Sequence, residues 1–401
     1  MTAQPLTRTP LTAKLAGFGT TIFAEMSALA VQTGSINLGQ GFPDTDGPPE
    51  VLDAAVEAIR SGVNQYPPGP GVPVLRQAIA DHQRRFYGLE LDPDREVLVT
   101  AGATEALAGA LLGMLDSGDE VVVFEPMYDS YQACIALAGA IAKPVVLRPG
   151  VGPQGQYGFD ADELRAAFSA RTKLVLVNTP HNPTGRIYPL ESLQAVADVL
   201  TEASARNGRT VYLIADEPYN RIVYDGRPFR SPAEVYPATM INYSFGKTLL
   251  APGMRIGYIA TPPGMPDRER LRNDIFTAQI ATGWAFPNAL LQHAIEDLDG
   301  LSIDVGALQR RRDRVVTALR GMGYETTDPE GTFYVMARAP IADDMAFGAL
   351  LADHGVLILP GTVVEAPGWF RISLTASDEM VERGLPGFER ARAAALAGPS
   401  V

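Results

Sequence analysis

Lys247 is accompanied along the chain by polar residues of several chemical types at fixed spacings. It lies in Ser244-Phe245-Gly246-Lys247, eight positions before Arg255, and it follows Asn182-Pro183-Thr184-Gly185 and Ala215-Asp216-Glu217-Pro218-Tyr219. An amine, a carboxylate, a phenol, an amide, a hydroxyl and a guanidinium are what a protein needs to hold pyridoxal phosphate (PLP). Taken alone, Lys247 would be interpreted as a surface lysine, so the prediction of a PLP site depends on the ordered set.

Lys247 is the residue that we expect to bond to the aldehyde of this cofactor. An amine reacts with a carbonyl group only when it is partly deprotonated, and burial near cations lowers its pKa. Once an amino acid has displaced it from the cofactor, the same amine is well placed to move the proton of the substrate's α carbon. The sequence therefore predicts that Lys247 both anchors the cofactor and transfers a proton.

Asp216 ends an apolar run, where a buried carboxylate is costly without a partner. Opposite a pyridine nitrogen it would keep that nitrogen protonated, although a helix N-cap explains it equally well because Glu217-Pro218 follows. Tyr219 and Asn182 are candidates for hydrogen bonds to the phenolic oxygen of the ring. A rigid turn without a ligand is an equally good explanation of Asn182.

The segment Thr100 to Glu105 is predicted to be a strand end, a glycine turn and the start of a helix. Exposed amides and the positive end of the helix dipole make such a junction an anion site. The alternative is a plain turn in which Thr104 is the N-cap. Ser244 and Arg255 would add a hydroxyl and a cation, so three separate parts of the chain could bind one phosphate.

Arg371 and Tyr66 are the remaining polar candidates. Arg371 lies in Trp369-Phe370-Arg371-Ile372-Ser373, at a position where a strand would carry an apolar residue. It could form a salt bridge between domains, or it could clamp an α-carboxylate with a charge-assisted pair worth about 1.5–3 kcal/mol. Tyr66 lies in a predicted loop and, without further context, would be a packing residue.

Short apolar runs alternate with helical patterns from about residue 97 to residue 260. The runs, which suit strands buried on both faces of a parallel sheet, are Val97–Thr100, Val121–Phe124, Leu174–Val177 and Val211–Ile214. Helices are predicted between them, over Thr104–Leu115 and Leu190–Ala205 among others. This alternation indicates an α/β layered fold, in which ligands bind at the carboxyl ends of the strands.

The two ends of the chain have other patterns. Pro49–Arg60 is predicted to be a helix with one apolar face, formed by Val51, Leu52, Ala55, Val56 and Ile59. A long helix is expected over Ser302–Met322, with Arg310-Arg311-Arg312 as a solvated face. A strand over Thr332–Met336, a helix near Met345–His354 and the strand around Arg371 then predict a small α+β domain.

Composition excludes several classes of function. The 401 residues exceed what one hydrophobic core usually serves, so two domains are expected, and a formal charge of −13 argues against nucleic-acid or anionic-membrane partners. The single cysteine, Cys134, excludes an intramolecular disulfide and a multi-cysteine metal site, and it is expected to be buried and inert. Without an apolar stretch of about 18 residues or a secretory signal, the protein is expected in the cytoplasm.

Together these motifs resemble those of the class I aminotransferases of PLP fold type I, over nearly the whole chain. The first half looks most similar to the kynurenine and N-succinyldiaminopimelate aminotransferase branch. The segments that carry this likeness are Phe18-Gly19-Thr20-Thr21-Ile22-Phe23, Ile36-Asn37-Leu38-Gly39-Gln40-Gly41-Phe42-Pro43-Asp44 and Glu125-Pro126. Two features depart from related sequences: the lysine that related prokaryotic aspartate aminotransferases often carry at the position of Thr104 is absent, and Thr248–Met254 differs from the Thr-Gly-Trp pattern common in the branch.

The resemblance implies a role for each matched residue. Lys247 matches the cofactor-binding lysine and Asp216 the partner of the pyridine nitrogen, while Asn182 and Tyr219 match the ligands of the phenolic oxygen. The phosphate ligands implied are Ala103, Thr104, Ser244 and Arg255, and Tyr128 falls where an aromatic ring stacks on the cofactor. The implied substrate ligands are Arg371, assisted by Gly41 and Asn182, with Phe23 lining the side-chain pocket.

Tyr66 matches a tyrosine that reaches the phosphate of the neighbouring subunit, which implies a homodimer. The implied domains are an N-terminal segment, 1–45, a large PLP-binding domain, 46–300, and a small α+β domain, 301–401, which the N-terminal segment joins. The implied reaction moves an amino group between an L-amino acid and a 2-oxo acid by a ping-pong mechanism through pyridoxamine phosphate.

Two alternatives remain at this stage. The same site could serve a PLP-dependent lyase, decarboxylase or oxidase, and product analysis would separate these from a transaminase. A non-catalytic regulator is the rival from another class. It is disfavoured because family-like sequence begins by about Phe18, which leaves no room for a helix-turn-helix domain.

Overall fold

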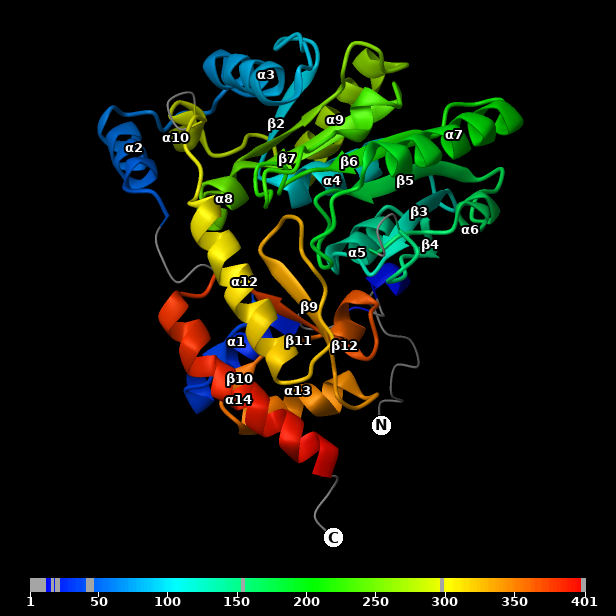
Figure 1. Ribbon diagram of the computed structural model, residues 1–401. Coiled ribbons are helices and arrows are strands. Elements are labelled where there is room, and N and C mark those ends of the chain that lie inside the picture. Colours follow the sequence, from blue (N-terminus) through cyan, green and yellow to red (C-terminus); the bar gives the residue numbers. More distant parts are fainter. Residues whose placement is uncertain are drawn as a thin grey trace, which may run out of the picture.

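The largest sheet has seven strands in the order β2-β8-β7-β6-β5-β3-β4, as seen in the computed structural model (Figure 1). Strand β8 is antiparallel to both of its neighbours, and the remaining pairs are parallel. The strands are β2 (Val97–Thr100), β3 (Glu120–Glu125), β4 (Ile141–Val146), β5 (Thr172–Asn178), β6 (Tyr212–Asp216), β7 (Thr239–Ser244) and β8 (Gly257–Ala260). The structure describes residues 12–15, 18, 22–40, 47–152, 156–295 and 299–397, without the side chains of 22–25 and 27.

Helices pack around this sheet because the apolar strands are buried on both faces. They are α2 (Pro49–Arg60), α3 (Pro73–Tyr87), α4 (Ala103–Met114), α5 (Ser130–Leu137), α6 (Ala161–Ala166), α7 (Leu190–Asn207), α8 (Phe245–Thr248), α9 (Arg268–Thr282) and α10 (Ala289–Gln292). Residues of β3, β5 and β6 form one core with α4 and α7. The four predicted strands and the helices at 49–60, 104–115 and 190–205 are therefore confirmed to within a few residues.

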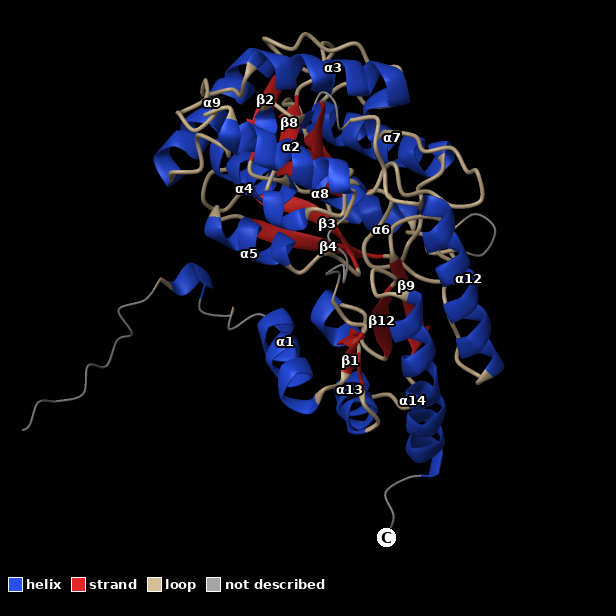
Figure 2. Cartoon of the chain, turned by 90° about the vertical axis from the view of Figure 1, so that its left-hand side faces the viewer, coloured by secondary structure: helices blue, strands red, loops and turns tan. Residues whose placement is uncertain are grey.

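A second region, in the lower half of Figures 1 and 2, contains residues 22–40 and the C-terminal part of the described chain. Its sheet has the order β11-β12-β9, formed by β9 (Tyr334–Arg338), β11 (Leu359–Pro360) and β12 (Trp369–Ser373). Its helices are α1 (Ile22–Thr33), α12 (Val305–Gly321), α13 (Asp344–Asp353) and α14 (Asp378–Ala397). Strand β1 (Ile36–Asn37) pairs with β10 (Val356–Leu357), so this part of the chain joins the C-terminal region, whereas η1 (Ala13–Leu15) contacts α5. The domain boundaries themselves stay a prediction.

Short 3-10 helices complete the chain: η1 (Ala13–Leu15), η3 (Pro232–Glu234), η4 (Pro252–Met254) and η5 (Gly361–Val364). Among the described residues, no helix is long and apolar enough to cross a bilayer. The same part of the chain contains no group of three or more potential metal ligands. Cys134 is only partly buried, and desolvation raises the pKa of its thiol to about 11, which keeps the thiol protonated and unreactive near neutral pH.

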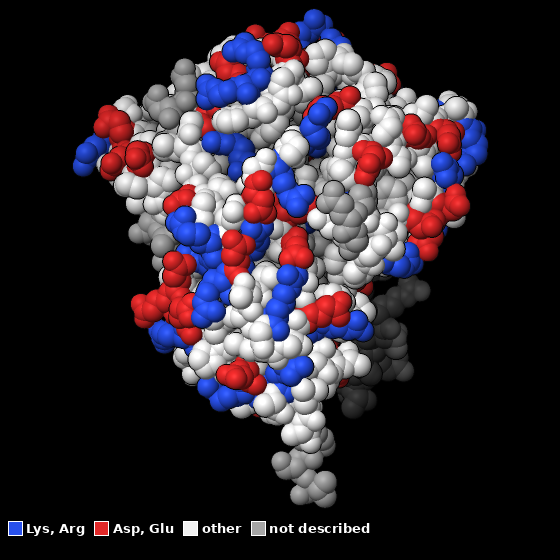
Figure 3. All heavy atoms as spheres, viewed as in Figure 1, with Lys and Arg blue, Asp and Glu red and all other residues white. Residues whose placement is uncertain are grey.

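The prediction of a solvated arginine face at 310–312 is wrong for two of the three residues. The Arg311 and Arg312 side chains are only 16% and 11% exposed. Arg311 pairs with Asp378 of α14, and Arg312 forms two hydrogen bonds with Asp225. Figure 3 shows the basic and acidic side chains interspersed over this face of the molecule. A basic run on a helix can thus hold neighbouring elements together rather than face water.

The apolar face predicted for α2 is also only partly a core face. Val51 is 1% exposed, but Leu52, Val56 and Ile59 are 41%, 44% and 61% exposed. These three side chains follow one another at helical spacing, so they form an apolar stripe on the surface of the described chain.

Candidate active site

Three polar residues lie side by side at the carboxyl ends of adjacent parallel strands. Asn178 of β5 is in register with Asp216 of β6, which is in register with Asn242 of β7. The side-chain amides of Asn242 and Asn178 donate to the Asp216 carboxylate at 2.9 and 3.4 Å. Asp216 is therefore a strand-end residue held by its neighbours, and the alternative of a helix N-cap is wrong.

Asp216 is buried, and this burial raises the pKa of its carboxyl group. Desolvation raises the pKa of its carboxyl to about 6, against the opposing effects of the Tyr131 hydroxyl, Lys247 and Asn242. The Tyr131 hydroxyl donates directly to the carboxylate. A protonated ring nitrogen placed here would supply the positive partner that a buried carboxylate needs.

Lys247 lies on the same side of the sheet, in the short helix α8 that follows β7 directly. Its Nζ is 5.8 Å from the centroid of the Tyr219 ring and 5.6 Å from that of Phe333. Both distances are within the range of a cation–π contact. The amine thus lies beside two neighbouring aromatic rings and lines the cavity that also contains Asp216.

The amino end of α4 has the features of an anion site. The helix begins at Ala103, and Gly102 is its N-cap without a side-chain hydrogen bond, so the prediction of Thr104 as the N-cap is wrong. Gly102 has a φ of 94°, and a Cβ there would lie 2.7 Å from Arg255 Nη2. The glycine thus lets the guanidinium approach the uncapped amides, and an anion can bind to both.

Arg371 lies on β12 as predicted and is 2% exposed. Its guanidinium donates to Asn182 Oδ1 at 2.9 Å and to the Gly39 carbonyl at 3.2 Å. The Asn182 backbone is in turn held by Asn178 Oδ1 at 2.6 Å. Arg371 is therefore held in place at the edge of the cavity, where a guanidinium can bind a carboxylate.

One cavity of about 570 Å³ brings these groups together, a volume within the usual range for a cofactor site. Ten of the predicted residues line it: Ala103, Thr104, Tyr128, Asn182, Asp216, Tyr219, Ser244, Lys247, Arg255 and Arg371. Three predicted residues are not placed there. Tyr66 is 87% exposed and contacts Phe286, Gly41 lies outside the described residues, and the side chain of Phe23 is not described.

Several lining residues were missed by sequence reasoning, among them Tyr131, Asn178, Asn242 and Tyr334. Asn178 and Asn242 carry a usable pattern, because each is a polar residue that ends or nearly ends an apolar strand beside Asp216. Tyr131 lies in α5, three residues after Tyr128, and the centroids of the two rings are 5.6 Å apart. Nothing local in the sequence marks Tyr334, whose contacts with Tyr219 and Arg371 are long-range.

The buried carboxyl group of Glu217, next to Asp216, has a raised pKa that can be tested through the pH dependence of stability. Burial raises the pKa of its carboxyl from 4.5 to about 8, while the Ser231 hydroxyl donates to it at 2.5 Å. Between these two pKa values the folded state binds more protons than the unfolded state, so stability falls as the pH rises. In urea unfolding, Glu217→Gln should gain roughly 2 kcal/mol relative to the wild type between pH 6 and 8. A difference that stays constant with pH would contradict this assignment.

With the site described, the comparison with known proteins is direct. A family model described as "Aminotransferase class I and II" matches residues 33–387. The chain belongs to this family. It is 40% identical over 355 residues to a probable N-succinyldiaminopimelate aminotransferase, DapC, of Mycobacterium tuberculosis, with 86% of each chain covered. A methionine aminotransferase of Escherichia coli is 36% identical over 367 residues, which cover 89% of this chain and 92% of the relative.

Solved structures agree with this assignment. The N-succinyldiaminopimelate aminotransferase of Mycobacterium tuberculosis superposes with a TM-score of 0.86 at 36% identity, over 95% of this chain and 100% of the other. A kynurenine–oxoglutarate transaminase of Dictyostelium discoideum is also among the relatives, at 32% identity over 80% of this chain and 76% of its own. The predictions of the fold class, of this branch and of an aminotransferase are confirmed. As members of its family do, this aminotransferase acts on amino and oxo acids.

Proposed function

We propose that this aminotransferase binds PLP in the cavity at Lys247 and exchanges an amino group between an L-amino acid and a 2-oxo acid in a ping-pong reaction. The observation that carries the proposal is one cavity that contains Lys247, the buried Asp216, an uncapped helix N-terminus beside Arg255, and Arg371. A negative partner, an anion site and an amine suit the pyridine ring, the phosphate and the aldehyde, respectively. The residues present therefore fit this cofactor.

Each residue has a defined task in the proposed site. Lys247 would hold PLP covalently and Asp216 would face its ring nitrogen, with Tyr219 and Asn182 at the phenolic oxygen and Tyr128 against the ring. Ala103, Thr104, Ser244 and Arg255 would bind the phosphate. When bound, PLP supplies an electron sink for the electrons of the broken Cα–H bond.

The chain's own residues then determine what happens to the substrate. Arg371 orients the α-carboxylate, which leaves the α carbon facing Lys247. Nζ of Lys247 would take the proton from the α carbon of the substrate and deliver it to the cofactor, so one amine would serve as both base and acid.

A single-turnover experiment tests the proposal. Purified protein loaded with PLP is mixed with a panel of amino acids that includes methionine, aspartate, kynurenine and N-succinyldiaminopimelate, and the cofactor absorbance is followed. We expect conversion to pyridoxamine phosphate, released oxo acid in equal amount, and reversal by a 2-oxo acid. Release of ammonia or of carbon dioxide without pyridoxamine phosphate would instead assign a lyase, oxidase or decarboxylase.

Replacement of Arg371 tests the carboxylate site. Arg371→Gln should raise KM about 10- to 100-fold for both the amino acid and the oxo acid, because both carry the carboxylate that loses a charge-assisted pair. Arg371→Lys should recover only part of this loss, since an ammonium group lacks the planar fork. Steady-state kinetics with each substrate varied in turn give both values. An unchanged KM in Arg371→Gln would remove Arg371 from the site.

We further propose a homodimer in which Tyr66 reaches the phosphate of the partner's site. The support is an apolar surface formed by Leu52, Val56 and Ile59 of α2, with Tyr66 and Phe286 in ring contact at 5.4 Å. Figure 1 shows α2 at the edge of the molecule beside α10, which follows Phe286 closely in the chain. Contiguous exposed apolar side chains of this kind indicate an interface, and a second copy supplies a matching surface.

A charge in this surface should separate the subunits. Ile59→Asp is expected to sediment as a monomer at micromolar concentration, because a carboxylate buried in the interface without a partner is costly. The monomer should lose PLP on desalting, since Tyr66 then no longer reaches the phosphate of a second site. Leu396→Asp is the matched control, since Leu396 on α14 is 58% exposed and lies away from this surface. Ile59→Asp that remains dimeric and keeps PLP would refute the interface.

A further inference from the structure

Tyr334 contacts both Arg371 and Tyr219, and none of the tasks above uses it. Its ring centroid is 4.0 Å from Cζ of Arg371, and its hydroxyl is 3.3 Å from the Tyr219 hydroxyl. The side chain is buried and lines the cavity. A guanidinium that rests on an aromatic face is held in one plane, which is the condition for gripping a carboxylate with two parallel hydrogen bonds.

The segment that carries Tyr334 bends sharply at Thr332. Thr332 has a φ of 65°, a conformation that β-branched residues rarely adopt. The bend is held from several sides: Thr332 N donates to the Ile222 carbonyl at 2.9 Å, the Tyr224 hydroxyl donates to the Thr332 carbonyl, and Thr332 Oγ1 accepts from Tyr334 N at 3.1 Å. Such a conformation persists only where the surroundings determine it, and it is often found at functional sites.

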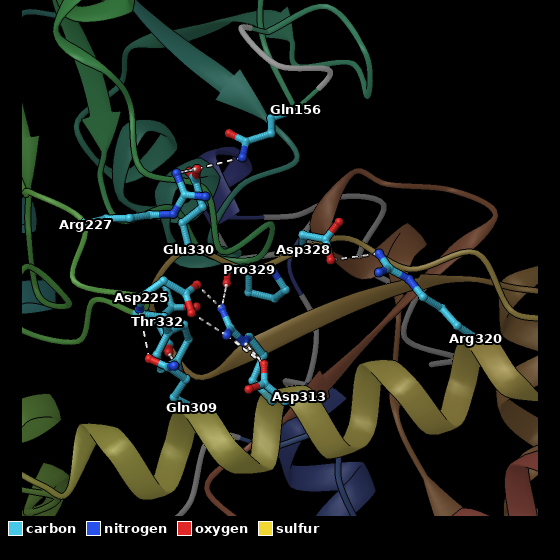
Figure 4. A network of polar contacts seen from close by, with 12 residues as sticks. Gln156, Asp225, Arg227, Gln309, Asp313, Arg320, Asp328, Pro329, Glu330 and Thr332 are labelled. Carbon is cyan, nitrogen blue, oxygen red and sulfur yellow. Dashed lines mark hydrogen bonds and ion pairs between the residues drawn. The ribbon is translucent and has the colours of Figure 1, made fainter.

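A buried carboxylate, Glu330, fixes the start of this segment (Figure 4). Its two oxygens accept from Gln156 at 2.7 Å, from Arg227 at 2.9 Å and from the Ile187 amide at 2.9 Å. Its backbone N–H donates to the Gly185 carbonyl at 2.8 Å. Glu330 thereby joins the segment of Tyr334 to the turn that contains Asn182, a side-chain partner of Arg371.

Arg312 of α12 holds the same segment one residue earlier. Its guanidinium donates to the Pro329 carbonyl at 2.9 Å while it forms two hydrogen bonds with Asp225, at 2.7 and 2.9 Å. The backbone N–H of Asp225 also donates to Oε1 of Gln309 on α12 at 2.9 Å. The long helix is therefore tied through this polar cluster to the bend at Thr332 (Figure 4).

We propose that Tyr334 is a positioning residue for Arg371. The polar contacts of Glu330 and Arg312 fix the strained segment that carries Tyr334. The proposal rests on the assignment of Arg371 to the substrate carboxylate. Tyr334 acts through the guanidinium and Glu330 acts through Tyr334, so a disturbance of either should weaken substrate binding more than it slows the chemical step. In kinetic terms, KM rises while kcat is largely retained.

Two substitutions at Tyr334 separate the ring from the hydroxyl. Tyr334→Leu removes the aromatic face and should raise KM for the amino acid about 10- to 30-fold, the factor expected for loss of a desolvated cation–π contact. Its kcat should stay within about 3-fold. Tyr334→Phe keeps the face and should keep KM within about 2-fold.

Glu330→Gln tests the distant part of the proposal without touching the cavity. It should raise KM about 3- to 10-fold, since residues that act through others commonly change binding by this much. Glu120→Gln is the matched control: Glu120 is also a buried carboxylate, which accepts from Arg171 and two hydroxyl groups, but it begins β3 at the far end of the sheet. It should lower the unfolding temperature comparably and leave KM unchanged.

The outcomes distinguish this proposal from the proposed function. If Tyr334→Leu and Glu330→Gln both retain the wild-type KM, or if Glu120→Gln raises KM as much as Glu330→Gln does, the positioning role is refuted while transamination stands. If Tyr334→Leu does not fold, Glu330→Gln with its control still decides. A wild-type protein that fails to transaminate, or Arg371→Gln with normal KM, would refute the proposed site itself.

Discussion

Replacement of Lys247 by alanine is expected to lower kcat/KM by at least about 10⁴-fold, because it removes both the covalent anchor and the proton-transferring amine. Among the described residues that line the cavity, the other cations are the guanidinium groups of Arg255 and Arg371. Neither can replace an amine as a base, since arginine stays protonated in proteins. Transfer of the amino group, measured as oxo acid formed in a coupled assay, gives the loss directly.

A matched lysine supplies the control for this experiment. Lys173 is 25% exposed and pairs with Asp119 at 3.3 Å, at the start of β5 and away from the cavity. Lys173→Ala should keep the wild-type activity and the wild-type absorbance of bound PLP. Addition of a small primary amine should restore part of the lost rate to Lys247→Ala only, because the amine can occupy the vacated space. Full turnover in Lys247→Ala without added amine would refute the assignment.

Replacement of Asp216 by asparagine is expected to lower kcat by about 10²- to 10³-fold, the loss typical when one preorganised electrostatic group is removed. Asparagine has the same shape but no charge, so it cannot keep a ring nitrogen protonated. Its amide also places a donor where Tyr131 and Asn242 already donate. Pre-steady-state kinetics of the half reaction, with saturating amino acid, measure the effect on the chemical step.

The carboxylate can be varied further to separate charge from packing. Asp216→Glu keeps the charge and should retain more activity than Asp216→Asn, even though it displaces the ring by one methylene group. Asn242→Ala removes one hydrogen bond to Asp216 and should lower activity less than either. If Asp216→Asn turned over as fast as the wild type, the buried carboxylate would have no part in the reaction.

The sheet, and the candidate residues that line one cavity, could be predicted from the sequence because both depend on local patterns. Continuous apolar runs marked β2, β3, β5 and β6, and the residues proposed for cofactor binding follow such runs closely in the chain. Parallel strands bring their carboxyl ends to one edge, so Asp216, which ends β6, and Lys247, which follows β7 closely, were expected to meet there. The pairing of each strand with its neighbour, including the antiparallel β8, was not predictable from these runs.

The errors concern surfaces that only tertiary structure defines. Helical periodicity identified the apolar face of α2, but it does not say whether that face meets this chain or a second copy. The positive charge of Arg312 predicted that its side chain faces solvent. In the structure this side chain pairs with Asp225, far away in the sequence, and is only 11% exposed. Tyr334 was overlooked because its partners, Tyr219 and Arg371, come from separate elements.

The register of Asn178, Asp216 and Asn242 has a consequence for how this enzyme can change. Side chains alternate between the two faces of a strand, so a one-residue insertion in β6 would turn Asp216 away from the cavity. By contrast, Pro252 and Gly253 line the cavity from a short 3-10 helix outside the sheet. Mutations that change which amino acid is preferred as substrate should therefore accumulate in such connecting segments. Selection should remove insertions and deletions from β5, β6 and β7. A library of variants made to accept new substrates should therefore vary those connecting segments.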